Sequence, residues 1–339
     1  MTSRSSRKIT VIGNGGWGTT LSILLHKKGY EVTLWGADAS YVNYLKEKRE
    51  NVKFLKGIPI PSGICITSDI SKKLLDAELI ISATPTPYLR SVLMKFKDLL
   101  VYRVPIVSVT KGIENNTLLR PSQIIADVVG KQSVSLLLGP SHAEEVAREL
   151  PTTTVASSQD AGLAQFVQEV FTTDRFRVYT NPDMIGVELG AAMKNVIAIA
   201  SGICDGLRFG DNSKAALITR GLAEISRLGI IMGAQRSTFA GLTGLGDLIT
   251  TCISPYGRNR WVGEQIGKGR KLSEILKSME QIAEGVWTTK SVTALSNRWN
   301  VEMPITKEIY NVLFTDKSPL DAVSNLMMRT PKSEVEELI

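Results

Sequence analysis

One lysine lies where a charged side chain is least expected, inside an apolar stretch made of small residues. Lys194 stands in Gly190-Ala191-Ala192-Met193-Lys194-Asn195-Val196-Ile197, so its ammonium group must reach the surface, pair with an acid or face a polar cavity. A second lysine, Lys111, follows a predicted strand that ends at Val109. Burial and a neighbouring cation both lower the pKa of a lysine, which enables it to accept a proton. The pattern indicates lysine acid/base chemistry, with snorkelling of Lys194 to the surface as the alternative.

The other residue types that carry chemistry are few. His26 lies on the first predicted helix among leucine and lysine residues, where a structural role is expected. His142 follows a predicted strand at the turn into a helix and is the better histidine candidate, although it has no obvious acidic partner in the nearby sequence. The three cysteines are far apart and form no CxxC pair, which argues against a disulfide framework and a zinc site. We therefore expect a reducing compartment and no metal.

A glycine-rich loop predicts a nucleotide site near the start of the chain. Gly13-Asn14-Gly15-Gly16-Trp17-Gly18 follows the predicted strand Ile9 to Ile12 and precedes a helical stretch from Thr19 to Lys28. Spaced glycines permit a tight turn and close approach of the backbone to a pyrophosphate, and the helix N-terminus supplies N–H groups to the anion. The strand–loop–helix context makes this motif specific, while a glycine-rich turn without a ligand is the alternative.

The second strand does not carry the usual signal for the choice of cofactor. It ends in Leu34-Trp35-Gly36-Ala37-Asp38, with no acid at the usual place for a ribose 2′-hydroxyl, because Asp38 comes late. Between Trp35 and Asp38 there is also no arginine or lysine that could bind a 2′-phosphate. Both NAD and NADP stay open, and the absence of a basic residue favours NAD.

Hydrophobic patterning divides the chain into two halves. Short β-rich runs alternate with helical stretches up to about Asn181, which predicts a parallel sheet covered on both faces, and long helical stretches follow. We expect an α/β protein with a Rossmann-type doubly wound sheet in residues 1–183 and an all-helical domain in residues 184–339. The expected later strands are Glu31 to Trp35, Leu79 to Ala83, Pro105 to Val109, Val134 to Leu138, Thr152 to Ala156 and Phe176 to Tyr179, and the expected helices are Ile185 to Gly202, Lys214 to Met232, Leu272 to Ala283 and Pro304 to Thr315.

Composition limits the classes of partner and location. The 339 residues carry a formal net charge of +7, but no basic run is interleaved with aromatic residues, so small anions fit better than nucleic acid, and a merely solvated basic surface remains the alternative. The polar stretch Met1 to Arg7 has no apolar segment behind it, and no apolar run approaches the roughly 18 residues that span a bilayer. We expect a cytoplasmic protein, for which the apolar, small-residue helices are compatible with a homodimer.

Several motifs in a fixed order give the sequence a family resemblance over essentially its full length. It closely resembles the bacterial-type NAD(P)-dependent glycerol-3-phosphate dehydrogenases. The resemblance implies interconversion of sn-glycerol 3-phosphate and dihydroxyacetone phosphate, in support of phospholipid synthesis. The motifs that carry it are Gly13 to Gly18, Thr110-Lys111-Gly112-Ile113-Glu114, Gly139-Pro140-Ser141, Lys194-Asn195-Val196-Ile197-Ala198, Thr219-Arg220-Gly221-Leu222-Ala223-Glu224, Gly244-Leu245-Gly246-Asp247-Leu248 and Gly257-Arg258-Asn259-Arg260.

The resemblance also implies roles for individual residues. Lys194 accepts the proton in oxidation and donates it in the reverse direction. On physical grounds, a Lys111 beside it would depress its pKa, and Asp247 could orient its ammonium group. The implied substrate contacts are Lys111, Gly139, Ser141, Lys194, Asp247, Gly257, Arg258 and Asn259, with assistance from Thr251. The glycine loop and the resemblance together give the cofactor contacts Gly13, Gly15, Gly16, Trp17, Gly18, Ala37, Lys111, Ala143, Arg258, Ile282 and Glu284.

The sequence departs from the family pattern at two positions. Ala37 stands where many members carry a basic residue, which weakens the case for NADP. Gly257 stands where members often carry serine, so only its backbone can contact substrate.

Two other functions are alternatives to this one. The first is a β-hydroxyacid dehydrogenase that also uses a lysine but recognises a carboxylate. Another is a catalytically silent nucleotide-sensing protein, against which Lys194 argues.

Overall fold

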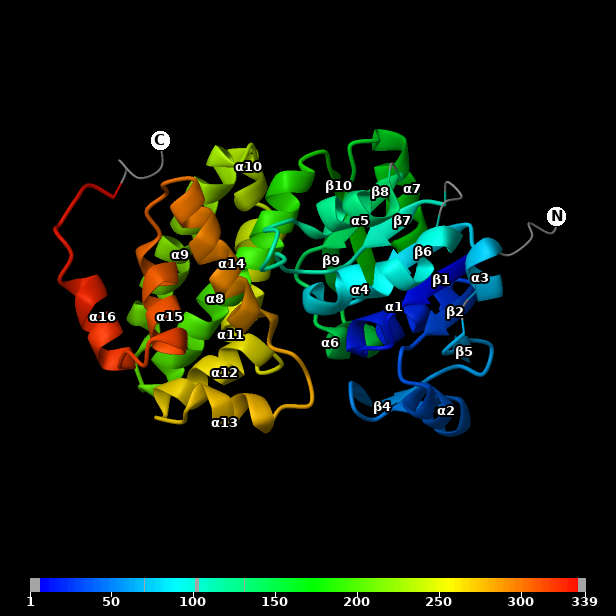
Figure 1. Ribbon diagram of the computed structural model, residues 1–339, viewed down its shortest axis with the longest axis horizontal. Coiled ribbons are helices and arrows are strands. Elements are labelled where there is room, and N and C mark those ends of the chain that lie inside the picture. The colour runs from blue at the N-terminus through cyan, green and yellow to red at the C-terminus, as the bar shows by residue number, and fades with distance from the viewer. Residues whose placement is uncertain (1–6, 70, 101–103, 131, 335–339) are drawn as a thin grey trace. The chain divides into compact units, whose positions relative to one another are not determined.

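The computed structural model describes residues 7–69, 71–100, 104–130 and 132–334, so most of the polar stretch Met1 to Arg7 lies outside the described residues. The chain forms two compact units (Figure 1). The first unit comprises residues 1–110 and 121–182, and the second comprises residues 111–120 and 183–339. A ten-residue segment that begins at Lys111 therefore belongs to the second unit, although it lies within the sequence of the first.

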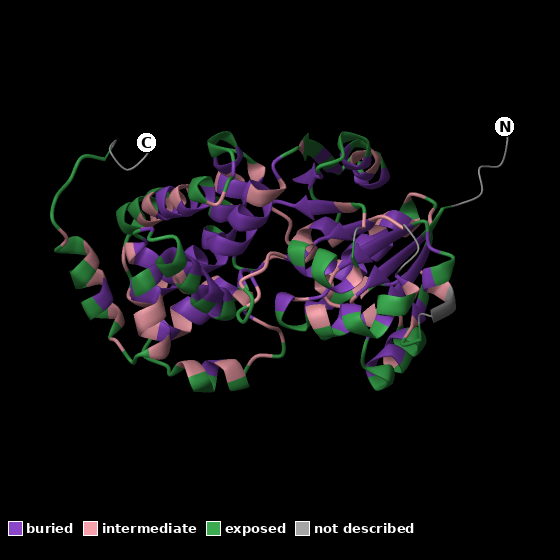
Figure 2. Cartoon of the chain, turned by 45° about the horizontal axis from the view of Figure 1, so that its top comes forward, coloured by how far each residue is buried: buried purple, intermediate pink, exposed green. Residues whose placement is uncertain are grey.

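The first unit is built on an eight-stranded sheet with the order β10-β9-β8-β7-β6-β1-β2-β5. Four consecutive residues of β1, Ile9 to Ile12, are all buried, which means that both faces of the sheet are covered (Figure 2). The strands are β1 Lys8–Ile12, β2 Glu31–Trp35, β5 Cys65–Thr67, β6 Leu79–Ser82, β7 Ile106–Ser108, β8 Val134–Leu138, β9 Thr152–Ser157 and β10 Phe176–Asn181, with a separate antiparallel pair of β3 Glu50–Asn51 and β4 Leu55–Pro59.

Helices connect these strands and cover the sheet. The core of the unit joins apolar side chains of the strands with those of α1, α2 and α7. The helices are α1 Gly16–Lys27, α2 Ala39–Lys48, α3 Ser71–Leu75, α4 Thr86–Phe96, α5 Pro121–Val129, α6 Ala143–Ala147 and α7 Ala161–Phe171, with a short 3₁₀ helix at Lys97–Leu99.

The expectation of a parallel sheet is wrong at one edge. β9 pairs with β8 in antiparallel orientation, and β10 is parallel to β9, so the last two strands run against the others. The connection between β8 and β9, residues 139–151, contains one helix, the five-residue α6, and so lacks the long crossover helix that usually joins parallel strands.

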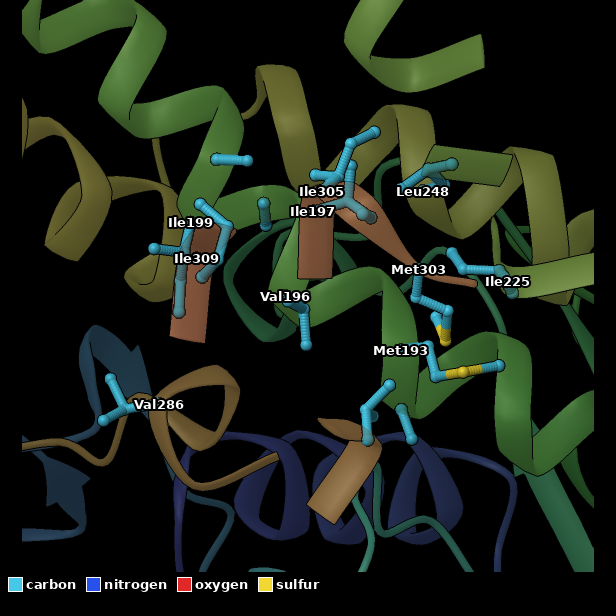
Figure 3. Close-up of a cluster of buried hydrophobic side chains, with 14 of the residues drawn as sticks. Met193, Val196, Ile197, Ile199, Ile225, Leu248, Val286, Met303, Ile305 and Ile309 are labelled. Atoms are coloured by element: carbon cyan, nitrogen blue, oxygen red, sulfur yellow. The ribbon is translucent and has the colours of Figure 1, made fainter. Parts of the chain in front are cut away.

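The second unit is helical and is organised around one long buried helix. α8 is buried at every position from Gly186 to Cys204, and its apolar side chains, including those of Met193, Val196 and Ile197, lie in a continuous hydrophobic cluster (Figure 3). The helices are α8 Met184–Gly206, α9 Asp211–Ile231, α10 Arg236–Phe239, α11 Asp247–Ile253, α12 Arg258–Gly267, α13 Leu272–Lys277, α14 Glu284–Arg298, α15 Pro304–Phe314 and α16 Pro319–Met327, with a π-helical turn at Leu242–Gly246.

By length and hydropathy, α8 alone among the described helices could cross a membrane, and the part that qualifies is wholly buried in the protein. One sequence expectation changes in this unit. The helix expected from Leu272 to Ala283 ends at Lys277, because the hydroxyl of Ser278 donates to the carbonyl of Ile275 at 2.8 Å and the chain turns away.

The segment 111–120 contacts the second unit near both of its ends. Ile113 lies in the hydrophobic core, and its carbonyl accepts a hydrogen bond from the hydroxyl of Ser291 at 2.9 Å. At the other end, the guanidinium of Arg120 pairs with the buried carboxylate of Glu188 on α8. These contacts hold Lys111, the first residue of the segment, against the second unit.

Candidate active site

A compact charged cluster lies on α8 in the second unit. The ammonium of Lys194 is 2.5 Å from Oδ1 of Asp247 and donates to the hydroxyl of Thr251 at 2.6 Å. The other oxygen of Asp247, Oδ2, accepts from Nζ of Lys111 at 3.0 Å. Lys194 is only 5% exposed and Asp247 only 1%, so the cluster is shielded from water, and the alternative in which Lys194 snorkels to the surface is excluded.

One turn of helix α11 supplies both partners of Lys194. Asp247 is its first residue, and Thr251 follows four positions later, so the two side chains share one face of the helix. This face turns towards α8, because both side chains contact Lys194 of that helix. A carboxylate and a hydroxyl thus converge on a single ammonium group.

The backbone before Asp247 sets the distance between the two helices. Residues Leu242–Gly246 form a π-helical turn, a geometry that is often found at functional sites. A Cβ atom on Gly190 of α8 would lie 2.5 Å from the carbonyl oxygen of Thr243, so only glycine permits this approach. Gly190 precedes Lys194 by four residues, and Thr243 precedes Asp247 by four, so this close contact brings the two charged side chains into register.

The pKa of Lys194 is lowered to about 8. Burial is the largest cause, because removing an ammonium from water disfavours its charged form. Asp247 acts against this effect, and the positive charge of Lys111 lowers the pKa further. Repulsion by Lys111 therefore acts in the expected direction, although desolvation contributes more.

The remaining second-unit candidates lie at the starts of α12 and α14. Arg258 is the exposed first residue of α12, and its side chain forms no ion pair or hydrogen bond with another described residue. The next residue, Asn259, is buried, and its Oδ1 accepts from the backbone N–H of Gly285 at 2.9 Å. Glu284 is the first residue of α14, and Ile282 lies just before it.

Gly257 is the N-cap residue of α12. A Cβ atom there would lie 3.0 Å from the carbonyl oxygen of Thr251, so a side chain would be tightly placed. The backbone of Gly257 therefore lies next to the residue whose hydroxyl contacts Lys194.

In the first unit, the glycine loop has the geometry of an anion site. Gly15 is the N-cap residue of α1, no side chain caps this helix, and a Cβ atom on Gly15 would meet no atom within 4 Å. Gly18 lies so close to the carbonyl oxygen of Gly13 that a Cβ atom would be 1.9 Å from it. The N-terminal N–H groups of α1 are thus open to a ligand, in a loop that only glycine can form, and the residues fit a dinucleotide phosphate.

The other first-unit candidates lie at strand ends and near this loop. Ala143, the first residue of α6, lies close to Gly16, and its carbonyl accepts from the hydroxyl of Thr20 at 3.2 Å. The ring of Trp17 packs into the core beside Phe176, which leaves its backbone for a ligand contact. Ala37 is exposed after the end of β2.

Gly139 and Ser141 follow strand β8. Gly139 has a positive φ of 139°, and the hydroxyl of Ser141 donates to its carbonyl oxygen at 2.9 Å. His142, the histidine candidate, is the N-cap residue of α6, directly after this turn.

Sequence reasoning did not identify Asn51, whose side chain contacts and supports the glycine loop. Its side chain is fully buried, and Nδ2 donates to the carbonyl of Asn14 at 2.9 Å and to the hydroxyl of Thr19 at 2.7 Å. Its Oδ1 accepts from the hydroxyl of Tyr41 at 2.7 Å. No spacing rule identifies this residue, because asparagine is usually found in exposed turns and the short strand β3 has no distinct pattern.

Comparison with known proteins gives one consistent result for both units. A family model described as the N-terminus of NAD-dependent glycerol-3-phosphate dehydrogenase matches residues 8–164, and one described as its C-terminus matches residues 183–324. The NAD(P)+ glycerol-3-phosphate dehydrogenase of Bacillus pumilus (strain SAFR-032) is 49% identical, over 98% of this chain and 97% of that protein. The enzyme of the same name from Chlorobium phaeobacteroides (strain BS1) is also 49% identical, over 97% of this chain and 99% of its own.

Solved structures agree with this result. The crystal structure of glycerol-3-phosphate dehydrogenase from Coxiella burnetii matches with a TM-score of 0.92 and 36% identity, covering 96% of this chain and 99% of that one. The glycerol-3-phosphate dehydrogenase of Plasmodium falciparum matches with a TM-score of 0.87 and 27% identity, covering 97% of both chains. A D-mandelate dehydrogenase with NADH, at 14% identity and a TM-score of 0.59 over 91% of this chain and 98% of that one, shares the fold alone.

Proposed function

The chain belongs to the family of NAD-dependent glycerol-3-phosphate dehydrogenases, and on that premise we propose that it interconverts sn-glycerol 3-phosphate and dihydroxyacetone phosphate with Lys194 as the acid and base. The observation that carries this assignment is the burial of Lys194 together with its contacts to Asp247 and Thr251. A lysine held in this way has a fixed direction and a pKa near neutrality, both of which proton transfer requires.

In the reducing direction, Lys194 acts as the acid. With a pKa of about 8, its ammonium is mostly protonated at pH 7 and gives its proton to the carbonyl oxygen of dihydroxyacetone phosphate as that oxygen gains negative charge. Lys111 provides a second positive charge that stabilises the developing alkoxide. Asp247 accepts hydrogen bonds from both ammonium groups. The hydroxyl of Thr251 accepts a further hydrogen bond from Lys194 and so helps to orient it. In the oxidising direction, the neutral amine takes the hydroxyl proton from glycerol 3-phosphate.

Arg258 is the proposed anchor for the phosphate of the substrate. Its guanidinium has no partner among the described residues, so it is available to a dianion, with which it forms charge-assisted hydrogen bonds. Oδ1 of Asn259 accepts a hydrogen bond from the backbone N–H of Gly285, which leaves its Nδ2 to donate to the same ligand. The backbone of Gly257, together with Gly139 and Ser141 of the first unit, completes the proposed set of substrate contacts.

NAD or NADP, when bound, supplies or accepts the hydride at the nicotinamide. The glycine loop from Gly13 to Gly18 would hold the pyrophosphate through backbone N–H groups at the start of α1. The proposed contacts beyond the loop are Ala37, Lys111, Ala143, Arg258, Ile282 and Glu284.

We also infer a cytoplasmic enzyme that supplies glycerol 3-phosphate for phospholipid synthesis. The free thiols of Cys65, Cys204 and Cys252 support a reducing compartment. A homodimer remains a proposal. It is supported by exposed apolar side chains of the second unit, among them Ile253, Trp287 and Met327.

The test of this function is the oxidation of NADH by dihydroxyacetone phosphate. The β-hydroxyacid alternative is tested separately, by the reduction of NAD with 3-hydroxyisobutyrate or with 6-phosphogluconate. We expect turnover with dihydroxyacetone phosphate alone. The variant Lys194→Ala should lose about two to four orders of magnitude in kcat, the scale of general acid/base catalysis, and should still bind NADH.

Lys214→Ala is the matched control, since Lys214 is also an ion-paired lysine of the second unit, bound to Asp205 at 2.5 Å. It should retain turnover. Full activity of Lys194→Ala would remove Lys194 from its role, and turnover of either hydroxyacid in place of dihydroxyacetone phosphate would refute the proposed substrate.

A further inference from the structure

The end of strand β2 lacks the acid that commonly binds the adenosine ribose in dinucleotide-binding folds. Asp38 is committed elsewhere, because its Oδ1 accepts from the backbone N–H groups of Ser40 at 2.9 Å and Tyr41 at 3.1 Å and so caps α2. Ala37 is exposed and offers no polar side chain. Another group has to recognise the ribose if this enzyme distinguishes NAD from NADP.

The side chain of Asn14 lies at this position. Asn14 is the second residue of the glycine loop, and its amide group packs against Gly36, the residue that follows β2. A Cβ atom on Gly36 would lie 2.4 Å from Nδ2 and 2.9 Å from Oδ1 of Asn14, so any larger residue would displace the amide. The Asn14 side chain therefore lies where the carboxyl ends of β1 and β2 meet, which is where this fold places the ribose.

The amide of Asn14 has no hydrogen-bond partner among the described residues, although its Nδ2 is buried. Buried polar groups without a partner are uncommon and ordinarily mark the position of a ligand, water or ion. The backbone of the same residue is fixed, because its carbonyl accepts from Nδ2 of Asn51 at 2.9 Å. A fixed backbone and an unpaired amide, in a residue that stays partly exposed, are suited to ligand recognition.

We propose that Asn14 is a specificity-determining residue for the cofactor, which recognises the ribose 2′-hydroxyl of NAD in place of the missing carboxylate. This inference rests on the proposed function and extends it to the choice between NAD and NADP. A hydroxyl can accept a hydrogen bond from Nδ2 and donate one to Oδ1, whereas the 2′-phosphate of NADP only accepts and needs a cation to balance its charge. No arginine or lysine lies between Trp35 and Asp38 to provide one.

The experiment measures equilibrium binding of NADH and of NADPH by fluorescence titration without substrate, so it does not depend on turnover. Asn14→Ala should weaken NADH binding about five- to tenfold, the effect of one lost hydrogen bond, and should change NADPH binding less than about twofold. Asn14→Asp restores an acceptor of similar volume, so it should retain NADH binding and weaken NADPH binding. Asn43→Ala, on the exposed face of α2 in the same unit, is the control and should change neither.

Three results would overturn the proposal: tighter binding of NADPH than of NADH by the wild type, equal losses for both cofactors in Asn14→Ala, or no loss at all. Circular dichroism of each variant establishes that it is folded, and Asn14→Asp gives the deciding result if the alanine variant is not. Oxidation of NADH by dihydroxyacetone phosphate is measured on the same preparations. A shifted binding ratio without turnover would refute the proposed function and support the role of Asn14, whereas turnover with an unshifted ratio would do the reverse.

Discussion

Replacing Lys111 by methionine should raise the pKa of Lys194. The substitution removes a positive charge and keeps most of the side-chain volume. Lys111 lies on one oxygen of Asp247 and Lys194 on the other, at 3.0 Å and 2.5 Å, so the two ammonium groups repel each other across a single carboxylate. Without Lys111, the charged form of Lys194 loses this repulsion and keeps the whole carboxylate.

The size of the shift follows from the separation of the charges. Two ammonium groups on the two oxygens of one carboxylate are at most about 8 Å apart, and two like charges within that distance repel by about 2 kcal/mol or more at an effective dielectric constant of about 20. That energy corresponds to between about 1 and 2 pKa units, and the lower end is expected because the Lys111 side chain retains 17% exposure. The pKa of Lys194 should therefore rise from about 8 to about 9.

The assay is the pH dependence of kcat/KM for the reduction of dihydroxyacetone phosphate. Reduction needs the protonated lysine, so the rate falls as the pH rises through the pKa of Lys194, and in Lys111→Met this fall should move to higher pH. The absolute rate will also drop, because Lys111 is a proposed substrate contact. The pH at which the rate falls nevertheless reports the pKa of Lys194.

Two controls separate charge from other effects. Lys111→Arg keeps the charge and should leave the pH of the fall near the wild-type value. Lys317→Met removes a comparably shielded lysine that pairs with Glu308 at 2.5 Å in the same unit, and it should also leave the profile in place. A fall in Lys111→Met at unchanged or lower pH would show that Lys111 does not depress the pKa of Lys194.

Two further predictions concern the substrate phosphate and the register of the cluster. Arg258→Ala should raise the KM for dihydroxyacetone phosphate about 10- to 100-fold, through the loss of charge-assisted hydrogen bonds, with a smaller effect on kcat; a lowered kcat at unchanged KM would contradict the phosphate assignment. Gly190→Ala places a Cβ atom 2.5 Å from the carbonyl of Thr243, so it should cost about 1–3 kcal/mol in the free energy of unfolding and lower kcat by displacing Asp247 from Lys194. Gly210→Ala, which meets no atom within 4 Å, is its control in denaturant unfolding and steady-state assays, and equal effects of the two variants would refute the steric explanation.

The sequence was most informative where local pattern decides the structure. The apolar runs predicted β2 and β8 with their observed bounds, because a strand buried on both faces is a continuous hydrophobic segment between turns. The direction of a strand is not encoded in this pattern. The reversal of β9 accompanies a connection that contains only the short helix α6, and the apolar residues of the strand do not specify it.

The site shows the same division between local and long-range information. Lys194 could be selected from sequence because a lysine in an apolar helix has few stable environments, of which pairing is one. Its partners could not be derived from spacing, since Asp247 and Thr251 lie more than fifty residues away and reach it through the packing of α11 against α8, to which the close contact at Gly190 contributes. Lys111 follows strand β7 in sequence, but the contacts of Ile113 and Arg120 place its segment in the second unit.

The number of carboxylates in the cluster explains how one lysine can serve in both directions. When both lysines are protonated, Asp247, Lys111 and Lys194 together carry one positive charge, and the loss of a proton from Lys194 leaves a neutral group of three. A second carboxylate beside Lys194 would favour the ammonium and raise its pKa, whereas no carboxylate would leave burial and Lys111 to lower the pKa further. One carboxylate shared between two lysines keeps the pKa at about 8, where the acid and base forms differ little in free energy near neutral pH. Because Asp247 is held by its contacts with both lysines, this balance depends on the packing of α11 against α8 as much as on the charges themselves.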